Sequence, residues 1–109
     1  MSLHPWAWLG LAILLEVAGT TFLKQSEGFT RVGEVVAMFL CYGLALVGLG
    51  LAVKRIEIGI AYAVWAGVGT ALIAFVGVLY FRESMTATKM LSIGLIILGV
   101  VGLNIEAGR

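Results

Sequence analysis

Residues 9–23 of the chain read LGLAILLEVAGTTFL, and Glu16 is the one charged side chain in this apolar run. A run of this kind predicts a membrane-spanning helix, because crossing the hydrocarbon core takes roughly 20 mostly apolar residues. A charged residue deep in such a helix costs at least ~2.5 kcal/mol on insertion scales, and it usually faces a cavity or a partner. The stretch therefore indicates both the class of fold and the place to look for function.

The composition of the whole chain agrees with a membrane protein. Its 109 residues are 61% hydrophobic and 12% charged, with a mean hydropathy of +1.11. A soluble domain carries about 25% charged residues, and a chain of this size could not hide so much apolar surface in one core. The net charge of +1 comes without a basic patch, so nothing indicates a nucleic-acid partner. With one histidine and no Ser/His/Asp set, no enzyme, cofactor or metal site is expected.

The chain holds four apolar runs of transmembrane length, at residues 5–23, 35–53, 58–81 and 85–105. Strands rarely exceed about 10 residues, and lipid forbids an open sheet edge, so each run is predicted to be a helix. We expect one all-α integral membrane domain over residues 1–109. Four helices are few for enclosing a pathway, so we also expect a homo-oligomer.

Loop charges hardly orient this domain in a membrane, although positive charge normally marks the cytoplasmic side. The N-terminus, second loop and C-terminus would share one side with three basic residues, namely Lys54, Arg55 and Arg109. The first and third loops would share the other side with four, namely Lys24, Arg31, Arg82 and Lys89. A single topology and insertion in both orientations stay open. Two oppositely inserted copies could pair as an antiparallel dimer with the geometry of an inverted repeat.

Glu16 lies eight residues from Trp8 and eight from Lys24. At 1.5 Å per residue this places Glu16 ~12 Å from either, near the middle of the bilayer. The other runs offer no basic residue at that depth, which leaves a proton or an external cation as the partner. Burial favours the neutral acid and a cation favours the ionised form, so protons and cations should compete. A permanently protonated Glu16 that bonds a neighbouring helix is the structural alternative.

Neighbouring helical positions show what could approach Glu16. Its face is shared by Leu9, Ala12, Ile13, Gly19 and Thr20. Ala12 and Gly19 are small, which leaves room for a ligand. In the third run, Tyr62 and Trp65 share a face, and aromatic faces attract cations most strongly in dry surroundings. Ordinary helix packing explains that pair equally well.

Two motifs make the chain resemble the small multidrug resistance transporters over essentially its whole length. They are AILLEVAGTTFLKQSEGFTR at residues 12–31 and GIAYAVWAGVG at residues 59–69, within a layout of four helices. The resemblance implies an antiparallel, dual-topology homodimer in a bacterial inner (plasma) membrane. It also implies alternating-access exchange of protons for small organic cations.

The same resemblance assigns roles to individual residues. Glu16 would be the shared proton and substrate site, with a pocket lined by Trp65, Tyr62, Tyr42, Ala12, Ile13, Gly19 and Thr20. Gly67 and Gly69 follow the third-helix aromatic pair, and we expect the helix to bend there as the dimer changes its open side. Ser92 and Gly99 match the small-x6-small seam through which dimers of the family pack.

Gly19 and Asn104 favour the quaternary-ammonium subtype, since guanidinium exporters of the family tend to carry Trp and Lys at these places. Two departures keep the second subtype open. Ala45 and Ala66 stand where hydroxyl residues are common, so the ionised form of Glu16 loses possible hydrogen-bond donors. The substrate could then be guanidinium or a substituted guanidinium or biguanide. A passive cation channel and a non-transporting helper subunit are the remaining alternatives.

Overall fold

The structure is a computed structural model that describes residues 4–107, and four helices make up most of this part of the chain. Their bounds are α1 (Pro5–Gln25), α2 (Val32–Ala52), α3 (Ile58–Tyr80) and α4 (Ala87–Ala107). Each helix is long and apolar enough to cross a membrane, so the prediction of four such helices is confirmed.

The first and third helices begin at the predicted residues, and the other helix ends differ from the predicted runs by one to three residues, because capping and polar first turns set them. α4 begins at Ala87 instead of residue 85, since the Thr86 hydroxyl accepts a hydrogen bond from the backbone N–H of Lys89 at 3.2 Å. α2 begins three residues earlier than predicted and holds Glu34 in its first turn, where an acidic side chain favours the helix N-terminus. Apolar length alone could not locate these ends.

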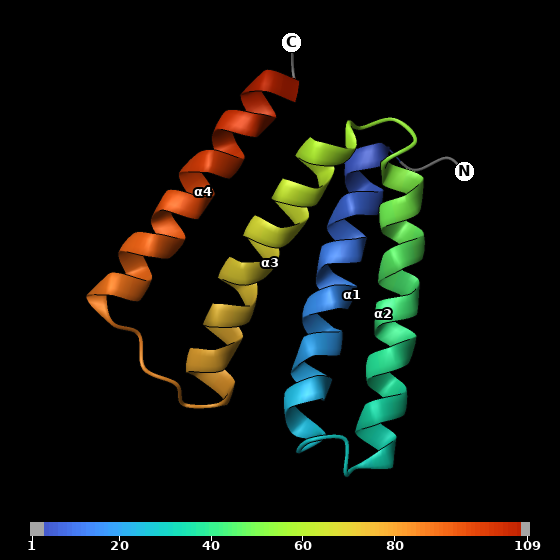
Figure 1. Cartoon of the computed structure of the whole chain (residues 1–109), viewed down its shortest axis with the longest axis vertical. Helices are drawn as coiled ribbons and strands as arrows, with labels where there is room; N and C mark the ends of the chain where they lie inside the picture. Colours follow the sequence, from blue (N-terminus) through green and yellow to red (C-terminus); the bar gives the residue numbers. More distant parts are fainter. Residues whose placement is uncertain (1–3, 108–109) are drawn as a thin grey trace.

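The helices lie side by side in the order α4, α3, α1, α2 (Figure 1). The molecule measures 45 × 38 × 17 Å, so the helices form a flattened layer. α1 lies between α2 and α3 and packs against both, while α4 packs mainly on α3. The first helix is therefore central, and a residue on its open face can meet side chains from two neighbours.

Successive helices run in opposite directions, which places the first and third loops at one end of the molecule (Figure 1). The second loop lies at the opposite end with both ends of the described chain. Basic residues divide as the sequence predicts, with Lys24, Arg31, Arg82 and Lys89 at one end and Lys54 and Arg55 at the other. Arg109 lies outside the described residues.

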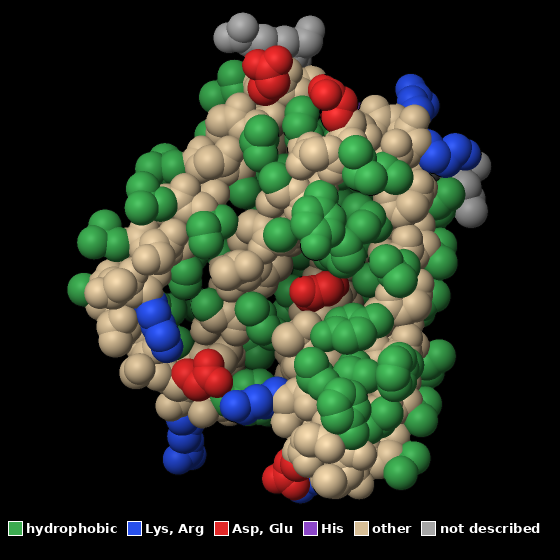
Figure 2. All heavy atoms as spheres, in the orientation of Figure 1, with side chains coloured by type: hydrophobic (Ala, Val, Ile, Leu, Met, Phe, Trp, Pro, Cys, Tyr) green, Lys and Arg blue, Asp and Glu red, His purple; other side chains and the backbone are tan. Residues whose placement is uncertain are grey.

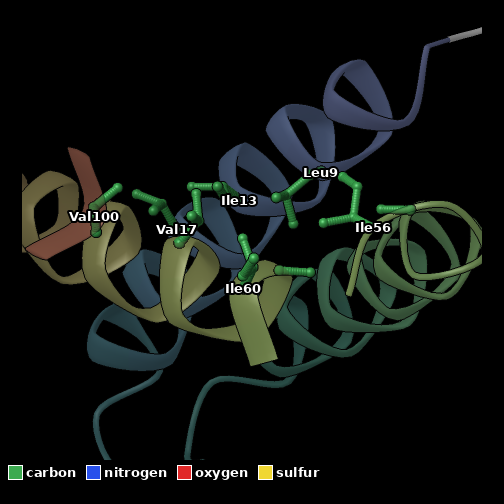
Figure 3. Packing of buried hydrophobic residues seen from close by; sticks show 9 residues of the cluster. Leu9, Ile13, Val17, Ile56, Ile60 and Val100 are labelled. Carbon is green, nitrogen blue, oxygen red and sulfur yellow. The ribbon is translucent and has the colours of Figure 1, made fainter. Parts of the chain in front are cut away.

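Branched apolar side chains form a core between α1 and α3. Leu9, Ile13 and Val17 recur every fourth residue of α1 and are buried together with Ile60 and other members of one cluster (Figure 3). Small residues join α1 to α2 instead: a β-carbon at Gly48 would lie 3.1 Å from the Ala12 β-carbon. Only 6% of the most apolar window of α4 is buried, which leaves that helix largely free to meet lipid or another chain.

Candidate functional site

Glu16 opens onto a cavity of about 350 Å³ between α1, α2 and α3. The cavity is lined by Glu16, Tyr42, Ala45, Leu46, Tyr62, Trp65 and Ala66. Glu16 is the only charged residue among them. In Figure 2 charged side chains gather toward the two ends, except for one acidic group near mid-height among hydrophobic side chains. The wall therefore combines one carboxylate with apolar and aromatic surface.

The same spacing on two helices builds the rest of the wall. Tyr42, Ala45 and Leu46 occupy positions i, i+3 and i+4 of α2, which face the same way. Tyr62, Trp65 and Ala66 repeat this pattern on α3. The sequence analysis missed Leu46 as a lining residue. Its place four residues after Tyr42 is the signal that could have revealed it.

Tyr62 and Trp65 contact each other edge to face, with ring centroids 5.7 Å apart and ring planes at 89°. This geometry suits the aromatic quadrupole and leaves part of each ring at the cavity. The indole Nε1 of Trp65 is buried and has no hydrogen-bond partner within residues 4–107. The predicted aromatic pair thus lies where the sequence places it, beside the Glu16 cavity.

Thr20 is the polar neighbour of Glu16. Its hydroxyl donates to Glu16 Oε2 at 3.3 Å and shares a hydrogen bond of 2.7 Å with the Tyr42 hydroxyl. Ala45 and Ala66 both line the cavity. The wall therefore has methyl groups at the two positions where the family resemblance leads us to expect hydroxyl groups. Lys24, on the same helix, pairs instead with Glu83 at 3.7 Å near the end of the molecule.

Gly19 does not simply leave the cavity open, as the sequence analysis expected. A β-carbon at this position would lie 2.6 Å from Cδ1 and Cε1 of Tyr42 and 3.3 Å from the Cys41 β-carbon. The space beside Gly19 is therefore filled by the ring of Tyr42 from the same chain. Gly19 acts on the cavity through Tyr42, because it permits that ring to lie against α1.

Ala12 and Ile13 lie in helix contacts and not in the cavity wall. Ala12 is fully buried against α2 at Gly48, and Ile13, only 5% exposed, belongs to the core cluster between α1 and α3. Both share a helical face with Glu16 in projection. The neighbouring helices cover that face on both sides, which leaves the carboxylate at the edge that opens to the cavity. Substrate contact by Ala12 or Ile13 stays a prediction.

The two glycines expected to bend α3 lie at different contacts. A β-carbon at Gly67 would lie 2.6 Å from Val100 Cγ2 and 3.1 Å from Ile96 Cγ2, both on α4. Gly69 lies beside the site, since its β-carbon would be 3.8 Å from Glu16 Oε1. α3 runs unbroken from Ile58 to Tyr80, and a bend at either glycine stays a prediction.

Ser92 and Gly99, the predicted dimer seam, are both exposed on α4. A β-carbon at Gly99 would meet nothing within 4 Å. Ser92 borders a groove that residues of α3 also line, and Ile96, one helical turn from both Ser92 and Gly99, lies beside Gly67 of α3, so this face is only partly free within the chain. Packing against a second chain stays a prediction.

Comparison with known proteins assigns the chain to a family. The model of the Small Multidrug Resistance protein family matches residues 4–96. The uncharacterized membrane protein YvaE of Bacillus subtilis is 49% identical over 100 residues, which cover 92% of this chain and 84% of that protein. NepA, a nicotine metabolites export pump subunit of Paenarthrobacter nicotinovorans, is 42% identical over 99% of this chain and 93% of its own length.

A third relative carries a resistance name. The quaternary ammonium compound-resistance protein QacG of a Staphylococcus species is 39% identical over 92% of this chain and 94% of its own length. The identity, the extent of these matches and the four apolar helices lead to one conclusion. The chain is a multi-pass membrane protein of the small multidrug resistance family.

Proposed function

We propose that this protein is a proton-coupled antiporter that exports lipophilic and quaternary ammonium cations, with protons and substrate competing for Glu16. The observation that carries the proposal is the single carboxylate in an otherwise uncharged aromatic and apolar cavity. Apolar walls bind the substituents of a lipophilic cation, and the carboxylate balances its charge. In low dielectric the same carboxylate is stable when it holds a proton or a cation.

The names of two relatives support this substrate class. QacG is named for resistance to quaternary ammonium compounds, and NepA for the export of nicotine metabolites. We extend the first of these to the present chain because its cavity holds no second carboxylate and no basic side chain. The relatives compared come from bacteria, which supports a place in the bacterial plasma membrane.

Alternating access would follow from an antiparallel homodimer. If two oppositely inserted chains adopted one identical conformation, the dimer would open to both sides or to neither. Two different conformations open it to one side, and exchanging them reverses the opening. The exposed positions Ser92 and Gly99 of α4 would join the copies, and α3 would bend near Gly67 and Gly69.

Export of guanidinium or substituted guanidinium compounds is the second candidate. It is favoured by Ala45 and Ala66 in the cavity wall, since these side chains give Glu16 no hydrogen bond and leave its carboxylate oxygens to accept from substrate N–H groups. A panel from guanidinium through biguanides to tetrapropylammonium separates the subtypes. The proposed subtype predicts that affinity rises with apolar substitution.

Substrate binding should release protons, and this tests the competition. Purified protein in weakly buffered detergent is titrated with tetrapropylammonium from several starting pH values, and the change in pH is recorded. We expect the solution to acidify until binding saturates. Glu16→Gln should show neither acidification nor binding of tetrapropylammonium. Glu16→Asp is the matched control, because it retains a carboxylate on a shorter side chain. Binding of the cation by Glu16→Gln at wild-type affinity would contradict the proposal.

A passive channel or a helper subunit would behave differently. A channel would conduct the cation without a pH gradient changing the direction of flux. For a helper, Glu16 would only join helices, and Glu16→Gln would preserve function. NepA is named as a subunit of a pump, so the helper role is tested by the same experiment.

A further inference from the structure

Three side chains form a hydrogen-bonded line from the cavity into the contact between α1 and α2. Thr20 Oγ1 lies 3.3 Å from Glu16 Oε2 and 2.7 Å from the Tyr42 hydroxyl oxygen. Glu16 and Thr20 are one helical turn apart on α1, and Tyr42 reaches them from α2. Glu16 and Tyr42 line the cavity, whereas Thr20 lies behind them and joins the two.

Counting hydrogens gives this line a direction. A threonine hydroxyl has one hydrogen, and an ionised carboxylate can only accept. With Glu16 ionised, Thr20 must donate to Glu16, so the bond between Thr20 and Tyr42 is donated by Tyr42. The hydrogen of Tyr42 then points away from the cavity, and a lone pair of its oxygen is left for a ligand.

Protonation of Glu16 permits the opposite direction. The carboxylic acid can donate to Thr20 Oγ1, and Thr20 can then donate to Tyr42. The Tyr42 hydrogen is released from this contact and can turn toward the cavity. The two hydrogen-bond directions therefore present different groups to a ligand, although no helix needs to move.

Packing holds Tyr42 in place for this hydrogen-bond relay, which runs from Glu16 through Thr20 to Tyr42. The ring lies against the bare backbone of Gly19, since a β-carbon there would come within 2.6 Å of two ring carbons. Thr20 follows Gly19 directly, so the residue that seats the ring precedes the one that bonds its hydroxyl. This arrangement explains why the hydroxyl reaches α1 at 2.7 Å.

We propose that Thr20 is a positioning residue that couples the protonation state of Glu16 to the hydrogen-bonding character of Tyr42. The cavity presents a hydrogen-bond acceptor when Glu16 is ionised and can present a donor when Glu16 is protonated. Cations that carry an N–H group gain an acceptor in the ionised state. Quaternary cations, which have no N–H, do not use it. This inference rests on the proposed function and assigns how its site responds to protons.

The other titratable and charged side chains around Glu16 do not replace Thr20 as its hydrogen-bond partner. The titratable residues that face Glu16 across the cavity are Tyr42 on α2 and Tyr62 on α3. α4 contributes no residue to the wall. On α1, Lys24 is two turns away and pairs with Glu83. Within the described part of the chain, Thr20 is the side chain with a hydrogen bond to Glu16.

The test measures tetrapropylammonium binding against pH for the wild type, Thr20→Val and Thr20→Ser in detergent. Valine keeps the shape of threonine and removes its hydroxyl, so the ionised form of Glu16 loses a donor. We expect the pH of half-maximal binding to rise by about half to one unit for Thr20→Val, since one hydrogen bond to a charged group is involved. Thr20→Ser should keep the wild-type profile.

Two further variants separate the relay from a structural role. Thr21→Val is the matched control, because Thr21 bonds the backbone oxygen of Val17 within α1. It should leave the profile unchanged. Tyr42→Phe should move the midpoint in the same direction by less, and it should add nothing to Thr20→Val. It should also weaken binding of tripropylammonium, which has one N–H, several-fold more than binding of tetrapropylammonium.

The results distinguish this inference from the function on which it rests. Failure of the proposed function would appear as pH-dependent binding by Glu16→Gln. Failure of the relay would appear as unshifted profiles of both Thr20→Val and Tyr42→Phe while Glu16→Gln has lost pH dependence. A uniform loss of affinity across pH for Thr20→Val would show a structural role and would also overturn the relay. Tyr42→Phe keeps the test decisive if Thr20→Val does not fold.

Discussion

Tyr42 lies against α1 because Gly19 has no side chain, and this contact sets one wall of the cavity beside Glu16. The ring occupies the position that a larger residue at Gly19 would take. The Trp that the family resemblance implies at this position in guanidinium exporters would therefore have a structural consequence. The Tyr42 ring could not remain where it is, so the shape of the cavity would change together with the residue.

The substitution Gly19→Ala tests the contact between Gly19 and the Tyr42 ring. Its β-carbon would overlap two ring carbons, and the ring or the helix must shift. We expect a loss of stability of about 1–3 kcal/mol, typical of overpacking, and weaker binding of bulky cations. Thermal unfolding in detergent and a binding titration measure the two effects.

Gly10→Ala is the matched control on the same helix. A β-carbon there meets nothing within 4 Å, and alanine is the better helix former. This variant should keep or slightly raise stability and leave binding unchanged. Equal effects of both substitutions would refute the specific contact between Gly19 and Tyr42.

Gly67 of α3 lies in a tight contact with α4. The γ-methyl groups of Val100 and Ile96 point at its backbone, and any side chain at Gly67 would push α4 away. From the sequence alone, Gly67 is predicted only as a point of bending. Packing and bending are separate properties. A second substitution that makes room beside Gly67 should restore packing but not bending.

A compensating substitution distinguishes them. Gly67→Ala should destabilise the protein by about 1–3 kcal/mol through overpacking. Adding Val100→Ala removes the Cγ2 methyl group that lies nearest to this position and should recover part of that loss if packing is the whole role. Unfolding of the two single variants and the double variant measures this coupling, and strictly additive losses would contradict it.

Transport tests the bend. Gly67→Val should slow exchange while substrate binding stays largely intact, because the bend belongs to the change of access and not to the site. Rates of cation exchange in liposomes are compared with binding titrations, with Gly59→Ala as an exposed glycine control on α3. Wild-type rates for Gly67→Val would remove the hinge from the account.

The sequence could predict what depends on length, apolarity and helical periodicity. These properties gave the four helices, the central carboxylate and the aromatic pair on one face of α3. Periodicity places residues on one side of a helix but does not say which neighbour covers them. Ala12, Ile13 and Gly19 share a face with Glu16, yet α2 and α3 cover all three. The Thr20–Tyr42 contact needed the relative placement of two helices.

At the scale of the whole molecule, the protomer is a thin sheet of helices whose outermost helix, α4, has little cover. The basic residues of the chain are divided almost evenly between the two ends of the molecule, which supports insertion in both orientations. Such a balance is sensitive, because one or two added charges can reverse the preferred side.

Charge substitutions should therefore fix the orientation. Ser84→Lys raises the count to five against three and should place the first and third loops in the cytoplasm. Glu57→Lys with Arg31→Ser and Arg82→Ser gives four against two in the opposite sense. Each variant alone should lose transport, and co-expression should restore it. Accessibility of single cysteines in each loop reports the orientation, and full activity of either variant alone would contradict the antiparallel dimer.

The central claim is that Glu16 couples proton movement to cation movement. Its most direct test uses proteoliposomes with tetrapropylammonium at equal concentration on both sides and an imposed pH gradient. We predict that the cation accumulates on the side with higher proton concentration, in proportion to the gradient, and that Glu16→Gln abolishes this accumulation. Tetrapropylammonium that stays at equal concentration on both sides despite the pH gradient would contradict this coupling. Uphill movement of the cation by Glu16→Gln would contradict it as well.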